Sequence, residues 1–164
     1  MSKDYLTDYG DLKTRAKALT EDVPYRISNL SNICSLIYET MEKVNWAGFY
    51  LLSDGALILG PFQGKTACIR IPLGKGVCGT AALRDSIQLV PDVSLFPGHI
   101  ACDPNSRSEI VIPIHENGNL FGVLDLDSAV VDRFGEEDRK GLSSFVEWLE
   151  SALPAWDLAG FETR

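Results

Sequence analysis

The stretch that decides the fold is Gly98–Asp127, GHIACDPNSRSEIVIPIHENGNLFGVLDLD. Two apolar runs, Ile110–Ile114 and Leu120–Leu126, flank Asn117–Gly118, a pair that favours the tight turn of a β-hairpin. Cys102 precedes the hairpin among Gly, His, Asp, Pro, Asn and Ser residues, which are typical of a loop. We therefore predict a β-hairpin preceded by a loop that carries a cysteine.

Three carboxylates lie at the edges of the two apolar runs. Asp125 and Asp127 are two residues apart on the second strand, so both side chains point to one face of the sheet, and Glu109 opens the first strand. The simpler interpretation is that these acids are solvated strand ends. A thiol in a loop beside acids on strands is, however, typical of a reaction site.

Along the chain, helices are predicted before and after the strand-rich region. Apolar residues recur at intervals of three and four in Pro24–Lys43 and in Glu136–Leu153, and a weaker helical pattern covers Asp4–Leu19. Cys34 lies on the apolar stripe of the first of these segments, which favours a core role over a chemical one.

The residues between the helices predict short strands and turns. Hairpin signals recur, which indicates an α+β fold with a central antiparallel sheet and the N- and C-terminal helices packed together on one face. GKGVCG is expected to be a turn that contains Cys78, followed by a short helix from about Thr80, and Gly60–Lys65 is expected to be a loop. The predicted strands are Trp46–Leu52, Ala56–Leu59, Thr66–Ile71 with Cys68 near its centre, and Ile87–Val90.

Composition limits the classes of function. The 164 residues fit a single domain, 1–164, with a core at about 24–153, and 45% of them are hydrophobic. A net charge of −8 disfavours nucleic acid and anionic membranes as partners. We find no apolar run of membrane-spanning length and no signal-peptide pattern in the polar N-terminus, so we expect a cytoplasmic protein.

The cysteines do not form a metal-binding pattern. None of the four belongs to a C-x-x-C pair, and there are only two histidines, so the sequence predicts neither a structural zinc site nor a cofactor. In a cytosolic protein, dispersed cysteines are usually buried small hydrophobes, which is the default interpretation for all four.

Five blocks of sequence change that interpretation for three of the cysteines. The blocks are WAGFYLL, GKGVCGTAA, GHIACD, SEIVIP and GVLDLDS. In this order they resemble the free methionine-(R)-sulfoxide reductases, a family of single GAF-domain enzymes that reduce the free amino acid, and the resemblance covers about 24–153. The family uses three cysteines spaced ten and then twenty-four residues apart, as Cys68, Cys78 and Cys102 are. Arg107 departs from the family, which often has Asn there.

The resemblance implies a cycle of cysteine oxidation. It assigns Cys102 as the nucleophile, Cys68 as the main resolving thiol and Cys78 as an alternative resolving or relay thiol, with a Cys68–Cys102 disulfide in the oxidised protein. The polar loop around Cys102 suits a thiolate, whereas the sequence alone does not rank the other two thiols. The cycle passes through a sulfenic acid and a disulfide, which an external dithiol reduces.

The resemblance also implies the binding groups and partners. It places Glu109, Asp125 and Asp127 in the active site, where carboxylates suit the ammonium group of a free amino acid and one raised-pKa acid can donate a proton. Trp46 and Tyr50 are expected to form an apolar wall, whereas Phe49 should face away from it. His99 is expected to orient the loop of Cys102, and the α-carboxylate to bind N–H donors of GKGVCG or of the long loop.

The family further implies a thioredoxin-like reductant, a homodimer and a role against oxidative stress. One alternative is a non-catalytic GAF sensor that binds a small molecule, and another is a structural or interaction protein with incidental cysteines. Loss of two thiols per chain after addition of methionine sulfoxide would distinguish the enzyme from both.

Overall fold

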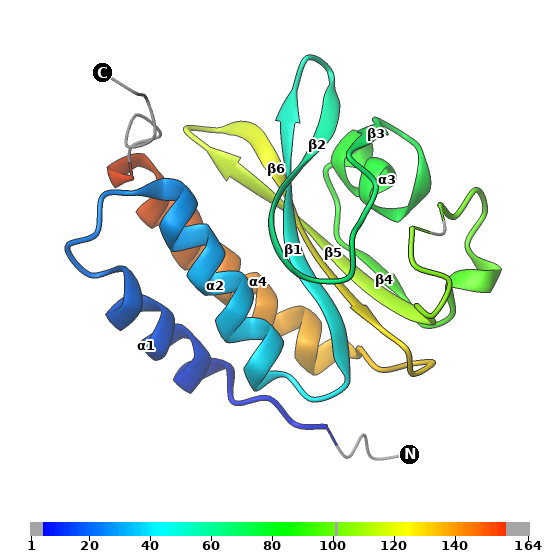
Figure 1. Ribbon diagram of the computed structural model, residues 1–164, viewed down its shortest axis with the longest axis horizontal. Helices are drawn as coiled ribbons and strands as arrows, with labels where there is room; N and C mark the ends of the chain where they lie inside the picture. Colours follow the sequence, from blue (N-terminus) through cyan, green and yellow to red (C-terminus); the bar gives the residue numbers. More distant parts are fainter. Residues whose placement is uncertain (1–4, 101, 157–164) are drawn as a thin grey trace.

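The computed structural model describes residues 5–100 and 102–156. A six-stranded antiparallel sheet in the order β3-β2-β1-β6-β5-β4 forms the centre of the molecule, with helices on both faces (Figure 1). The strands are β1 (Val44–Ser53), β2 (Ala56–Gly64), β3 (Arg70–Pro72), β4 (Gln88–Val90), β5 (Ser108–Glu116) and β6 (Asn119–Ser128). The helices are α1 (Tyr9–Thr20), α2 (Arg26–Thr40), α3 (Gly76–Arg84) and α4 (Glu136–Ala152), with 3-10 turns at Val93–Leu95 and Leu153–Ala155.

The β5–β6 hairpin forms around the Asn-Gly turn that the sequence predicts. Asn117 and Gly118 have φ angles of 52° and 80°, the left-handed values that a two-residue hairpin turn requires. The register pairs Glu109 with Asp127 and Val111 with Asp125. Glu109, Asp125 and Asp127 therefore lie together on one face, while Ile110, Leu124 and Leu126 point to the other.

One face of the sheet is covered by α2 and α4, which lie side by side with α1 packed against them (Figure 1). The apolar stripes of α2 and α4 join the inward residues of β1, β5 and β6 in one core, in which Phe49, Leu142 and Phe145 are fully buried. Three acids in the first turn of α4 suit the positive end of its helix dipole. The predicted α+β fold, with these helices on one face, is confirmed.

The opposite face carries α3, which packs on β5 and β6 over a second, smaller core. Gly79 allows α3 to lie close to β3, because a Cβ atom there would lie 2.5 Å from the carbonyl oxygen of Pro72. Among the described residues, no helix is both long and apolar enough to cross a membrane.

The expected loop at Gly60–Lys65 is wrong, since β2 continues to Gly64 and pairs with β1. The register shifts between Gly48 and Tyr50, which leaves Gly60 and Pro61 opposite Phe49 alone. Pro61 is tolerated in the strand because this bulge needs no ladder hydrogen bond from its nitrogen.

The expected strand Thr66–Ile71 is also wrong over most of its length. Only Arg70–Pro72 pairs with β2, and Cys68 lies in the irregular segment before it. Gly64, with φ of 131°, lies where β2 ends, and the chain returns to β2 at Ile69, whose carbonyl accepts from the N–H of Leu59.

Helix boundaries differ from the predictions in smaller ways. The helix α3 begins at Gly76 rather than about Thr80, so Cys78 lies in its first turn and not in a loop. Of its two glycines, Gly79 packs against β3, and Gly76, with φ of 61°, packs against Ile100. The helix α2 is shorter at both ends than Pro24–Lys43, and α1 begins at Tyr9, whereas Asp4 lies outside the described residues.

Candidate active site

A pocket lies between α3, the loop before β5 and the sheet face opposite α2 and α4. The empty space between its walls is about 520 Å³, a volume that includes space open to solvent. The structure brings nearly all of the residues singled out from the sequence to its wall: Trp46, Tyr50, Cys78, His99, Cys102, Glu109, Asp125 and Asp127.

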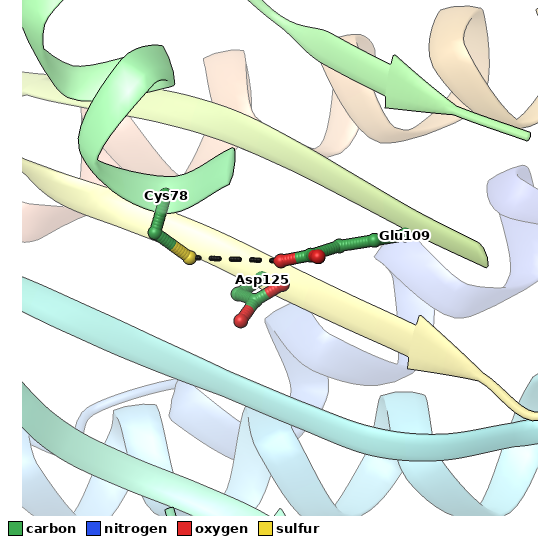
Figure 2. Close-up of side chains that lie close together, drawn as sticks. All are labelled: Cys78, Glu109 and Asp125. Carbon is green, nitrogen blue, oxygen red and sulfur yellow. Dashed lines mark hydrogen bonds between the residues drawn. The ribbon is translucent and has the colours of Figure 1, made fainter. Parts of the chain in front are cut away.

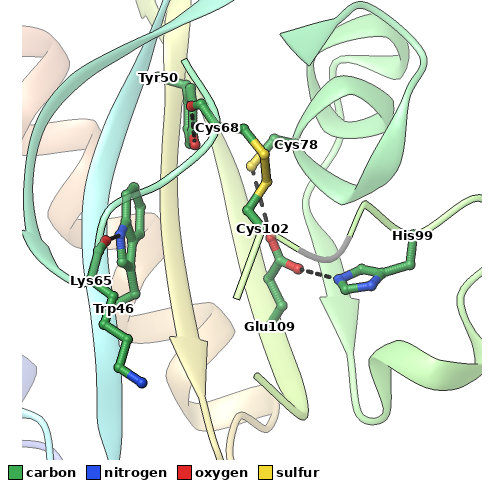
Figure 3. The surroundings of a disulfide bond; sticks show 8 residues. All are labelled: Trp46, Tyr50, Lys65, Cys68, Cys78, His99, Cys102 and Glu109. Atoms are coloured by element: carbon green, nitrogen blue, oxygen red, sulfur yellow. Dashed lines mark hydrogen bonds and ion pairs between the residues drawn. A yellow bond between two sulfur atoms is a disulfide. The ribbon is translucent and has the colours of Figure 1, made fainter. Parts of the chain in front are cut away.

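Cys68 and Cys102 are joined by a disulfide at this pocket, with their Cα atoms 5.7 Å apart (Figure 3). The predicted pairing is therefore present. Cys68 comes from the segment between β2 and β3, and Cys102 from the long loop between β4 and β5. Both are half-buried, so a reductant can approach the bond from solvent.

The three carboxylates form a buried acidic cluster beside the disulfide. Glu109 and Asp125 are each 5% exposed, and Asp127 is half-buried. Burial and the charge of Asp127 raise the pKa of Glu109 to about 8. Burial and the neighbouring Glu109 raise the pKa of Asp125 well above its usual range, and burial and Asp125 do the same for Asp127. Protonated carboxylic acids are therefore available at neutral pH.

Cys78 contacts this cluster directly. Its Sγ lies 3.8 Å from Oε1 of Glu109, and its side chain also faces Asp125 (Figure 2). Burial and the charges of Asp125 and Glu109 raise the pKa of the Cys78 thiol well above its usual range. Cys78 is thus a neutral thiol in this state, while Cys68 is the residue bonded to Cys102.

His99 lies on the loop of Cys102 and faces the cluster from the other side. Its Nε2 is 3.6 Å from Oε2 of Glu109, and burial lowers the pKa of the imidazole. The contact links the loop to β5, which agrees with the expected orienting role. Arg107, the departure from the family, contacts Ser128 and Val93 through its backbone.

Trp46 and Tyr50 form a stacked aromatic wall, with ring centroids 5.8 Å apart. Both side chains also hold the segment that carries Cys68. The indole N–H of Trp46 donates to the carbonyl of Lys65, and the hydroxyl of Tyr50 donates to the carbonyl of Cys68 (Figure 3). The wall therefore positions the disulfide as well as lining the pocket.

Sequence reasoning missed several residues of the site. Phe62 stacks on the outer face of Trp46 at 5.3 Å, and it was placed in a loop because the strand β2 was cut short. Lys75 and Ser106 line the pocket as well. Lys75 lies within the GKGVCG motif and Ser106 within the long loop, so both segments were identified, but neither side chain was.

Comparison with known proteins agrees with this geometry. The sheet, its helices and the pocket place this protein in the class of single α+β domains with a small-molecule pocket. The GAF domain family model matches residues 25–153. Protein YtsP of Bacillus subtilis is 51% identical over 93% of this chain and 94% of its own length. The free methionine-R-sulfoxide reductase of Escherichia coli is 49% identical over 93% of each chain.

Solved structures give the same result. The structure named fRMsr of Staphylococcus aureus, in its reduced form, superimposes with a TM-score of 0.87 at 49% identity, covering 90% of this chain and 96% of the other. The same protein in complex with its substrate gives a TM-score of 0.85. The chain belongs to the GAF domain family, in the group that includes the free methionine-R-sulfoxide reductases.

Proposed function

We propose that this protein reduces free L-methionine (R)-S-oxide to L-methionine, as an oxidoreductase with Cys102 as the nucleophile and Cys68 as the resolving thiol. The observation that carries the proposal is the Cys68–Cys102 disulfide in a pocket that also contains buried acids of raised pKa. This pairing of a thiol couple with proton donors is what sulfoxide reduction needs.

The first chemical step transfers the sulfoxide oxygen to Cys102. A protonated acid of the cluster donates to that oxygen, the Cys102 thiolate attacks the sulfur, and methionine leaves as Cys102 becomes a sulfenic acid. Cys68 then attacks the sulfenic sulfur, which forms the disulfide and releases water. The 5.7 Å between the two Cα atoms is a normal distance for such a bond.

Substrate recognition follows from the chemistry of the walls. The acidic cluster consists of Glu109, Asp125 and Asp127, and the ammonium group of the amino acid binds those of the three that are ionised. The methyl end lies against Trp46 and Tyr50. The N–H groups at the start of α3 and the ammonium group of Lys75 are suited to the α-carboxylate.

A thioredoxin-like dithiol completes the cycle by reducing the disulfide. Its thiolate attacks one sulfur to give a mixed disulfide, and its second thiol releases the reduced protein. The partial exposure of Cys68 and Cys102 supports this route. We also propose a homodimer, by analogy with the family.

The experiment that tests the function is an assay on the separated R and S epimers of free methionine sulfoxide. We expect consumption of the R epimer alone, together with the loss of two thiols per chain when reduced protein meets that epimer without a reductant. A non-catalytic sensor would bind without losing thiols. Equal activity on both epimers, or thiol counts that do not change, would contradict the proposal.

Cys34 is outside this chemistry, so Cys34→Ser should keep kcat/KM within about twofold of the wild type. Cys34 is fully buried on α2, and its Sγ contacts the carbonyl oxygen of Pro61 at 3.1 Å. A serine hydroxyl there lowers the free energy of unfolding by about 1–3 kcal/mol, because a more polar group is buried. Steady-state kinetics and urea titration measure the two effects. An inactive variant with a native circular dichroism spectrum would show that Cys34 takes part in the reaction.

A further inference from the structure

Three potential metal ligands meet at the inner end of the pocket. Cys78 from α3, Glu109 from β5 and Asp125 from β6 place a sulfur and two carboxylate oxygens within 4.8 Å of one another (Figure 2). All three side chains are buried, yet they line a pocket that opens to solvent, so a small ion has a path to them. The sequence argument against zinc applied only to ligand pairs close in the chain, whereas these ligands come from distant segments.

Cys78, Glu109 and Asp125 hydrogen-bond to one another, but one buried acceptor of the group is left without a partner in the described structure. Oδ1 of Asp125 is buried without a hydrogen-bond partner among the described residues, although the side chain is only 5% exposed. In the part of the chain that the structure describes, the only ion pair that involves Cys78, Glu109 or Asp125 is the one between His99 and Glu109. An unpaired buried acceptor costs free energy, and a cation at this position would satisfy it.

The spacing and the chemistry of the ligands favour zinc. In a tetrahedral site with Zn–S about 2.3 Å and Zn–O about 2.0 Å, sulfur and oxygen lie about 3.5 Å apart. The observed distance from Sγ of Cys78 to Oε1 of Glu109 is 3.8 Å. A thiolate disfavours Mg²⁺ and Ca²⁺, which prefer oxygen ligands alone.

We propose that Zn²⁺ binds to Cys78, Glu109 and Asp125 and inhibits the protein by occupying its proton donors and its ammonium site. Binding displaces the thiol proton of Cys78 and any carboxyl protons into solvent, and no electron is transferred. The inhibitory consequence rests on the proposed reductase function, whereas metal binding itself does not. The ligands exclude Cys68 and Cys102, so the site is present while the disulfide is intact.

Oxidised protein offers a direct test with Co²⁺ as a spectroscopic probe. With the Cys68–Cys102 disulfide formed, Cys34 and Cys78 are the free thiols. We expect one Co²⁺ per chain, a thiolate-to-cobalt absorption band in the near ultraviolet, and loss of that band when Zn²⁺ is added. The band should be absent in Cys78→Ser and retained in Cys34→Ser, the matched control.

A second variant covers the case in which Cys78→Ser does not fold. Asp125→Asn should weaken Co²⁺ binding by at least about tenfold while keeping the band at saturation. No band in the wild type, or a band that is lost in Cys34→Ser and not in Cys78→Ser, would overturn the site.

Inhibition is measured separately in single turnovers of reduced, desalted protein, without a chelating reductant. Zn²⁺ should slow methionine release at low substrate, and saturating substrate or a chelator should restore the rate, while Mg²⁺ should have no effect. Zinc binding without an effect on turnover would overturn the inhibitory role. A protein that binds Co²⁺ through Cys78 but reduces no sulfoxide would instead contradict the proposed function.

Discussion

Cys102→Ser is expected to release no methionine, even in a single turnover. The proposed chemistry begins with attack by the Cys102 sulfur, and a serine hydroxyl is far too weakly acidic to replace a thiolate. The variant should still fold, because Cys102 is half-buried in a loop and outside both hydrophobic cores. Rapid-quench measurement of methionine from reduced protein and the R epimer gives the result, and methionine release by this variant would refute the mechanism.

Cys68→Ser is the matched control, since it removes the other half of the disulfide. It should release one methionine per chain and then cycle very slowly with thioredoxin, because the sulfenic acid at Cys102 has lost its partner. Peptide mapping of substrate-oxidised wild-type protein should show a Cys68–Cys102 bridge. If Cys78–Cys102 were the dominant bridge, the resolving roles of Cys68 and Cys78 would be exchanged.

The second large effect concerns the acidic cluster and the pH. The sulfoxide oxygen needs a protonated donor, and the pKa of Glu109 is raised to about 8 by burial and by Asp127. If Glu109 is that donor, the rate of the chemical step should fall about tenfold per pH unit above about pH 8, because the protonated fraction of Glu109 falls. Because the nucleophile must be a thiolate, the rate should also fall at low pH, which gives a bell-shaped profile.

Amide substitutions locate the donor within the cluster. Glu109→Gln, Asp125→Asn and Asp127→Asn keep the shape of each side chain but remove its acidic proton and its charge. The variant that lacks the donor should lose about 10²-fold or more in the single-turnover rate, together with the alkaline limb of the profile. A variant that lacks only an ammonium partner should raise KM instead.

Glu137→Gln is the control for these substitutions, because this acid is exposed in the first turn of α4. It should leave both the rate and the pH profile unchanged. Wild-type kinetics in all three cluster variants would restore the simpler interpretation of Glu109, Asp125 and Asp127 as acids at strand ends without a chemical role.

Local sequence determined the elements whose signals need no distant partner. The turn at Asn117–Gly118 requires residues that tolerate positive φ, and an Asn-Gly pair supplies them wherever it occurs. The apolar stripes of α2 and α4 predicted both helices and the face that they share, because helical periodicity depends on neighbours three and four residues away. The cysteine spacing and its resemblance to a family likewise needed no coordinates.

Tertiary structure alone decided the features that depend on long-range pairing. The strand β2 passes through Pro61 because β2 bulges there, with Gly60 and Pro61 opposite Phe49 of β1, and β3 is short because only Arg70–Pro72 pairs with a neighbouring strand. The resemblance to the family implied the Cys68–Cys102 disulfide, whereas the residues alone did not rank Cys68 above Cys78. The structure brings Cys68 to Cys102, 34 positions away, with their Cα atoms 5.7 Å apart.

The raised pKa values of the acids in the site also depend on the tertiary structure. In the sequence, Asp125 and Glu109 have the pattern of solvated acids at strand ends, but α3 and the long loop bury both side chains. Burial raises their pKa values. The helix α3 also places Cys78 beside Glu109, which lies 31 residues further along the chain. The exposure of a side chain depends on every element packed over it, so no local pattern in the sequence determines which acids remain protonated.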